Sequence, residues 1–90
     1  MLTLADELAH LRSADDHLRN AVYLISVQQD RVKRQRAAGL ETALSEGLLS
    51  LMNATLRNFI QHRVAICEAI KIARRAALLD PHAENAGHAL

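Results

Sequence analysis

The chain has 90 residues and is 50% apolar, but one Tyr and one Phe are its only large aromatic side chains. Sixteen Ala and fifteen Leu stand against three Gly and one Pro, which is typical of long helices because Gly and Pro break them. A single Cys excludes a disulfide scaffold. The formal net charge of +1 does not by itself require a nucleic-acid or membrane partner.

The first predicted element is a helix over about residues 3–38, because apolar residues recur with alternating steps of four and three. Thr3 is expected to cap its start. Gly39 is the residue type favoured in the left-handed position after a helix end. The predicted seam is formed by Leu4, Leu8, Leu11, Asp15, Leu18, Val22, Ile25, Gln29, Val32 and Arg36.

The second predicted element is a helix over about residues 42–79, with Thr42 as its expected cap. Pro81 disfavours a helical residue before it, and residues 81–90 are expected to form a flexible tail because they show no periodicity. The second seam is formed by Leu49, Met52, Leu56, Phe59, Arg63, Ile66, Ile70, Ala73 and Ala77.

A link as short as residues 39–41 makes the two helices antiparallel neighbours. Facing residues then have numbers that sum to about 81, and this register brings the two seams together. Asp15 and Arg63 fall one layer apart and could pair, which would fix the register. The alternative is that Asp15 is a functional carboxylate. The sequence therefore predicts an all-α fold, in which residues 1–80 form an antiparallel two-helix hairpin.

A further apolar stripe lies outside the predicted seam, on the side where we also place Ala14, Ala21 and Gln28. An exposed aliphatic face of this length indicates association. We expect two copies to pair through it as a homodimeric four-helix bundle. The expected interface residues are Leu24, Leu44, Leu48, Leu51, Thr55, His62, Ala65, Ala69 and Ile72.

Two histidines, His17 and His62, fall at one level of this face. Because imidazole binds zinc and titrates near neutrality, they are candidates for a metal or pH-sensing site. The alternative is that they only form hydrogen bonds in a partly polar interface. His17 is also a weak candidate for phosphate transfer, and Glu7 and His10 have the Glu-x-x-His spacing of di-iron bundles without the further inward carboxylates.

Four basic residues near the predicted turn, Arg31, Lys33, Arg34 and Arg36, are candidates for phosphate contact. The alternative is that they only complement the helix dipole at its C-terminal end. No Gly-rich phosphate loop or paired cysteines are present, and Cys67 has no base placed beside it. We therefore expect neither a cofactor nor an enzyme.

The stretch from Ala14 to Ile70 resembles a group of small, uncharacterised bacterial helical-hairpin proteins. The similarity rests on Gln28-Gln29, Arg34-Gln35-Arg36, the turn from Gly39 to Glu46, Leu48-Leu49 and Gln61-His62-Arg63. The resemblance implies the hairpin fold and no particular activity. This chain is more apolar than the group, notably at Tyr23, Leu24, Val27 and Ile60.

The expected function is that of a non-enzymatic interaction or regulatory module, acting as a homodimer. One alternative is an inhibitor or adaptor that docks the apolar face on another protein's helices. Another is a nucleic-acid-binding bundle that uses the basic tip. The acidic start from Met1 to Glu7 does not fit a signal peptide, and no apolar run approaches the roughly 20 residues of a membrane span. We therefore expect a cytoplasmic protein.

Overall fold

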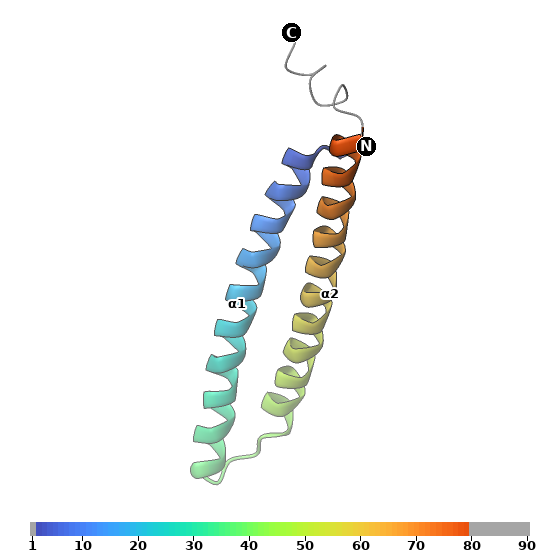
Figure 1. The fold of residues 1–90 in the computed structure, drawn as a ribbon. Coiled ribbons are helices and arrows are strands. Elements are labelled where there is room, and N and C mark those ends of the chain that lie inside the picture. The colour runs from blue at the N-terminus through green and yellow to red at the C-terminus, as the bar shows by residue number, and fades with distance from the viewer. Residues whose placement is uncertain (1, 80–90) are drawn as a thin grey trace.

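The computed structural model of the chain describes residues 2–79. It has two helices, α1 (Leu4–Ala37) and α2 (Ala43–Leu79), which lie side by side and antiparallel (Figure 1). Each helix begins one residue after its expected start. The all-α hairpin is therefore confirmed, and the expected tail at 81–90 lies outside the described residues.

The start of α1 is fixed by a reciprocal pair of hydrogen bonds between Thr3 and Asp6. The Thr3 hydroxyl accepts from the backbone N–H of Asp6 at 3.1 Å, and the Asp6 carboxylate accepts from the backbone N–H of Thr3 at 3.1 Å. Two N–H groups that the helix leaves unpaired are thereby satisfied. Thr3 is the predicted cap, and the structure confirms it.

The end of α1 turns on Gly39, whose φ of 70° is the left-handed conformation expected of it. The Gly39 N–H donates to the Arg36 carbonyl at 3.0 Å and the Leu40 N–H donates to the Gln35 carbonyl at 2.9 Å. These two bonds form a Schellman motif, which satisfies carbonyls at the helix end and stops the helix.

The start of α2 differs from the prediction in which side chain caps it. The Glu41 carboxylate accepts from the backbone N–H of Thr42 at 3.0 Å and of Ala43 at 2.9 Å. The Thr42 hydroxyl instead donates to Glu46 at 3.1 Å. Thr42 directly precedes α2, but the prediction that its side chain caps the helix was wrong, because the hydroxyl is bonded to Glu46 and the charged Glu41 accepts from the first N–H groups instead.

The predicted seam of α2 is confirmed, since all nine of its residues are buried or half-buried. The most enclosed part lies toward the end that carries the N-terminus. There, Ile66 and Ile70 pack against Ala14, and partly buried Leu4, Leu8 and Leu11 surround them.

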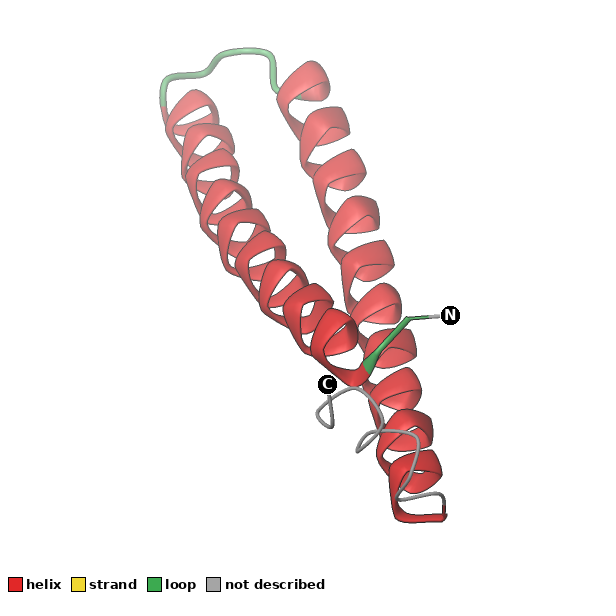
Figure 2. Ribbon diagram, turned by 90° about the horizontal axis from the view of Figure 1, so that it is seen from above, coloured by secondary structure: helices red, strands yellow, loops and turns green. Residues whose placement is uncertain are grey.

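The predicted seam of α1 is correct only in part. Val22, Gln29 and Arg36 are exposed, whereas Ala14 and Gln28, which we had placed on the outer face, are buried between the helices, and Ala21 is half-buried. The contact stripe on α1 is shifted by one residue toward the N-terminus, from Val22 to Ala21 and from Gln29 to Gln28. The reason is that α2 crosses the face of α1 obliquely and the helices diverge toward the connection (Figure 2).

The hairpin has little interior. Ala14, Ile25, Val32, Ile66 and Ile70 are the buried apolar residues of the described part of the chain, and none of its large side chains is fully enclosed. Neither described helix has a stretch long and apolar enough to cross a membrane. A single two-helix seam thus leaves most of the aliphatic surface facing outward.

Candidate association face

One side of the hairpin carries an open groove of 390 Å³ at the middle of α1. We call it the apolar groove. It contains no Asp, Glu, Lys or Arg, and His17 is the only ionisable side chain that lines it. Its lining residues are His17, Asn20, Ala21, Leu24, Ile25, Leu48, Leu51, Met52, Thr55 and Phe59.

One end of the apolar groove is built by an aromatic contact between the helices. The imidazole of His17 stacks on the ring of Phe59, with ring centroids 5.6 Å apart and planes inclined by 29°. Phe59 belongs to the seam of α2 and is half-buried, so the exposed His17 ring extends that seam outward. One turn before Phe59 in α2, the Thr55 hydroxyl donates to the Leu51 carbonyl at 3.0 Å. This bond satisfies the hydroxyl within the helix.

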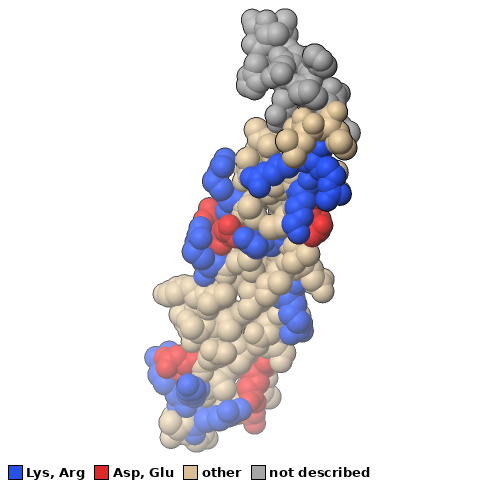
Figure 3. All heavy atoms as spheres, in the orientation of Figure 1, with Lys and Arg blue, Asp and Glu red and all other residues tan. Residues whose placement is uncertain are grey.

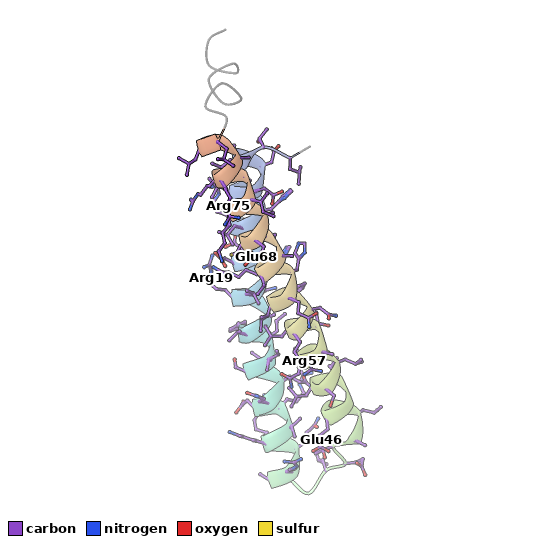
Figure 4. The ribbon with its side chains drawn as sticks, turned by 45° about the vertical axis from the view of Figure 1, so that its right-hand side comes forward. Arg19, Glu46, Arg57, Glu68 and Arg75 are labelled. Carbon is purple, nitrogen blue, oxygen red and sulfur yellow. The ribbon has the colours of Figure 1, made fainter. Side chains whose placement is uncertain are left out.

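The apolar groove lies in a zone of the hairpin that has almost no charge. Residues 20–29 of α1 and 47–56 of α2 contain no Asp, Glu, Lys or Arg, and Arg57 is the only such residue between 47 and 62. The space-filling view shows charged side chains gathered toward both ends, with a largely uncharged middle (Figure 3). Arg19, Glu68 and Arg75 lie toward the end that carries the N-terminus, and Glu46 lies beside the connection (Figure 4).

Four of the expected interface residues line the apolar groove, namely Leu24, Leu48, Leu51 and Thr55. The other five lie outside the groove. Leu44 is 91% exposed, Ile72, His62 and Ala65 are exposed, and Ala69 is half-buried. The expected face is therefore open to a partner in the single chain, apart from Ala69.

The structure does not bring His62 into the apolar groove, because the ring that meets His17 is that of Phe59. Across residues 2–79 of one chain, no three His, Cys, Asp or Glu side chains gather as a metal site needs. The side chains of Glu7 and His10 approach each other to 4.0 Å, one turn apart along α1. A metal held by His17 and His62 would need side chains from a second chain.

The basic residues near the connection are mostly engaged within the chain. Arg34 pairs with Asp30 at 3.1 Å, and Arg36 pairs with Glu46 across the two helices. Arg31 donates to the side-chain oxygen of Gln28 at 3.3 Å. Lys33 has no ion pair within residues 2–79. Intramolecular partners thus occupy most of the groups proposed to contact phosphate.

The expected pair between Asp15 and Arg63 is confirmed, with Arg63 Nε 2.6 Å from Asp15 Oδ1. The hydrogen bond to Asp15, and then its charge, raises the pKa of Arg63 above its ordinary value. The same guanidinium contacts the sulfur of Cys67 at 3.7 Å. Cys67 is half-buried beside the seam and is not in the apolar groove.

The sequence did not indicate the part played by Gln28. This residue is only 3% exposed, and its side-chain amide donates to the Ser45 carbonyl at 2.8 Å. The contact ties α1 to the first turn of α2, close to the apolar groove. The only sequence signal for it is the heptad position of Gln28, which follows Ala14 and Ala21 at steps of seven.

Comparison of the chain with protein-family models, with curated proteins and with solved structures finds no match. The functional argument therefore rests on the apolar groove and the residues around it.

Proposed function

We propose that the protein is a non-enzymatic interaction module in which two hairpins pair through the apolar groove and its flanks to form a four-helix bundle. The observation that carries this proposal is the groove itself. It is a concave aliphatic surface, free of fixed charge, on a hairpin whose charged residues gather toward its ends.

The small interior of the hairpin supports association. Leu24, Leu44, Leu48, Leu51 and Ile72 are all among the exposed large apolar residues. Burying one such side chain fully contributes about 1.5–3 kcal/mol. Monomeric proteins rarely leave a contiguous aliphatic face of this length in water, because each of these side chains then contributes nothing to stability.

The dimensions of the face suit a second hairpin. Helix α2, with 37 residues, is about 55 Å long, and two helices packed side by side are about 20 Å wide. One whole side of the hairpin therefore projects roughly 1,000 Å², which is large enough to hold the roughly 800 Å² per partner that a stable complex buries.

The pattern of large and small residues favours a second copy over a different protein. Leu44, Leu48 and Leu51 occupy the connection half of α2, while Ala65 and Ala69 occupy the other half. A two-fold axis across the helix sets the large residues of one copy against the small residues of the other, which is how packed layers interlock. The absence of fixed charge in the groove gives no basis for selecting a charged partner.

The observed ion pairs weigh against nucleic acid as the partner. Arg34 and Arg36 have carboxylate partners within the chain, so phosphate contact would first have to break those pairs. An adaptor that docks on another protein's helices would use the same apolar groove. It differs from the homodimer in leaving the pure protein monomeric.

The test is sedimentation equilibrium of the wild-type protein and of two matched variants at micromolar concentration. Leu51→Glu places a charge in the apolar groove at a residue that is 67% exposed. Val64→Glu is the control. It replaces a residue of similar exposure, 56%, thirteen positions along α2 and so on a different side of the helix.

We expect a dimer for the wild type and for Val64→Glu, and a monomer for Leu51→Glu. Because Leu51 is exposed in the hairpin, its substitution should leave the helix content of the monomer intact by circular dichroism. A wild-type protein that stays monomeric at 100 micromolar would overturn the proposal and favour a different protein partner. A dimer that Val64→Glu breaks and Leu51→Glu does not would show that another face is used.

A further inference from the structure

We infer that pairing through the apolar groove is controlled by protons, with His17 as the group that responds. The inference rests on the proposed function, because it concerns what happens to His17 when a second copy covers the groove. Its structural basis is the position of a single ionisable ring at the edge of a cleft that is otherwise apolar or uncharged.

The environment of His17 on α1 offers its charged form no free counter-ion. Asp16, its neighbour in the chain, pairs with Arg19 on the same helix. Asp15, two residues before His17, pairs with Arg63 of α2. Both carboxylates therefore already have a guanidinium partner. Next to His17 in the groove are Asn20 and Ala21, which carry no charge.

On α2, the side chain that faces His17 is the ring of Phe59. The nearest charged or titratable residues along α2 on either side of Phe59 are Arg57, His62 and Arg63. Arg57 and Arg63 are cationic and His62 is cationic when protonated, so none of them is a counter-ion for a protonated His17. Leu48, Leu51 and Met52 continue the groove without charge.

Covering the apolar groove removes the water that solvates the imidazolium form of His17. A cation that loses water and gains no partner is disfavoured, so the dimer holds His17 in its neutral form. Protonation in the monomer then competes with pairing. Imidazole side chains in general change charge between about pH 8 and pH 5. Excluding a proton from both copies of His17 in the dimer weakens association on the order of 100-fold between pH 8 and pH 5.5.

The other ionisable groups on the hairpin do not share this position. His10 lies beside Glu7, and His62 does not line the apolar groove. Acidic side chains ordinarily titrate below pH 5. A loss of pairing between pH 8 and pH 5.5 therefore fits an imidazole and not a carboxyl group, and substitution decides whether His17 is responsible.

The experiment is sedimentation equilibrium of the full chain at pH 8, 6.5 and 5.5, at constant ionic strength, for the wild type and three variants. His17→Phe keeps a ring to stack on Phe59 and removes the proton. His17→Gln is a second neutral variant, in case the larger ring changes the packing. His10→Gln is the control, because the His10 side chain is exposed on α1 and neither lines the apolar groove nor belongs to the expected interface. Helix content by circular dichroism at each pH separates dissociation from unfolding.

We expect the dissociation constant of the wild type and of His10→Gln to rise about 100-fold from pH 8 to pH 5.5. For both His17 variants we expect a change of less than about threefold, since no other groove residue titrates. A wild-type dimer with the same dissociation constant at both pH values would overturn the inference and leave the proposed function intact. Pairing that remains equally pH-dependent in both His17 variants would also overturn it. A protein that is monomeric at every pH would overturn both.

Discussion

Arg63 on α2 donates from Nε to Oδ1 of Asp15 on α1 at 2.6 Å, between seam positions 48 residues apart in the chain. The other polar side-chain contacts between the helices in residues 2–79, Gln28 with Ser45 and Arg36 with Glu46, lie near the connection. The Asp15–Arg63 pair therefore fixes the register of the hairpin toward its other end.

A charge exchange across this pair tests its part in the register. We expect Asp15→Arg and Arg63→Asp each to lower the melting temperature, because each sets like charges against each other. The double variant should recover most of the loss. Both side chains are partly exposed, at 34% and 41%, so 1 M salt should shrink the effect of each single variant. Thermal unfolding followed by circular dichroism measures this.

The control for the charge exchange is Arg19→Asp, since Arg19 pairs with Asp16 on the same helix and both side chains are well exposed. It should change the melting temperature less than Arg63→Asp does. If the melting temperature of the double variant falls by the sum of the two single decreases, the pair does not contribute to the register.

The two described glycines give opposite predictions for the same substitution. Gly39→Ala should lower the free energy of unfolding by about 1–2 kcal/mol, because φ at Gly39 is +70° and a Cβ is disfavoured there. Gly47→Ala, inside α2, should raise it by about 0.5–1 kcal/mol. An added Cβ meets nothing within 4 Å at either position, so the backbone alone sets the sign. Urea unfolding of the two variants measures both, and equal signs would contradict the left-handed turn.

The capping box at the start of α1 makes a prediction about acid. The backbone N–H of Thr3, and then its side chain, hold the pKa of Asp6 below its ordinary value of 3.8. A lowered pKa means that the folded state favours the carboxylate. Its contribution is therefore present above the ordinary pKa and is lost as the pH falls through the lowered one. Fraying of the first turn of α1 is expected to begin only below about pH 4.

Nuclear magnetic resonance of the Asp6 carboxyl measures this pKa directly. Thr3→Ala removes the hydroxyl and should raise the pKa of Asp6 part of the way. Thr3→Pro also removes the N–H and should raise it further; the φ of −79° at Thr3 lies within the range that proline adopts. The titration of Asp16, ten residues along α1, should not move in either variant. An Asp6 pKa that stays the same in both would contradict the capping box.

The hairpin, its seam on α2, the Thr3 cap and the Asp15–Arg63 pair follow from local rules of periodicity, capping and turn chemistry, and so the sequence predicts them. The error on α1 has a different origin. A heptad pattern assumes that the partner helix follows one stripe throughout, whereas α2 crosses α1 obliquely. From residue 21 onward the facing positions are therefore Ala21, Ile25, Gln28 and Val32.

The candidate site was predicted less completely than the fold. Leu24, Leu48, Leu51 and Thr55 were chosen by heptad position and line the apolar groove. The stacking of His17 on Phe59 was not predicted, since it depends on rotamers and on how far the helices diverge. The ion pairs near the connection were not predicted either. The partners of Arg34 and Arg36 are Asp30 and Glu46, and the basic cluster was considered without these acidic residues.

The adjacent residues Gln28 and Gln29 distinguish the observed contact stripe from the heptad stripe. Gln28 is 3% exposed and donates to the Ser45 carbonyl, whereas Gln29 is exposed. We expect Gln28→Ala to lower the free energy of unfolding by about 1–2 kcal/mol, from the lost hydrogen bond and the space left behind. Gln29→Ala should change it by less than about 0.5 kcal/mol.

Gln28→Glu sharpens the same comparison. A carboxylate in place of the amide sets negative oxygens beside the Ser45 carbonyl at a buried position, so we expect a larger loss than in Gln28→Ala at pH 7. Part of that loss should be recovered near pH 4, where the carboxyl gains a proton and can donate again. Gln29→Glu should show no such recovery. Urea unfolding of all four variants at pH 7 and pH 4 gives the measurement. Equal effects at positions 28 and 29 would contradict the observed contact stripe of α1.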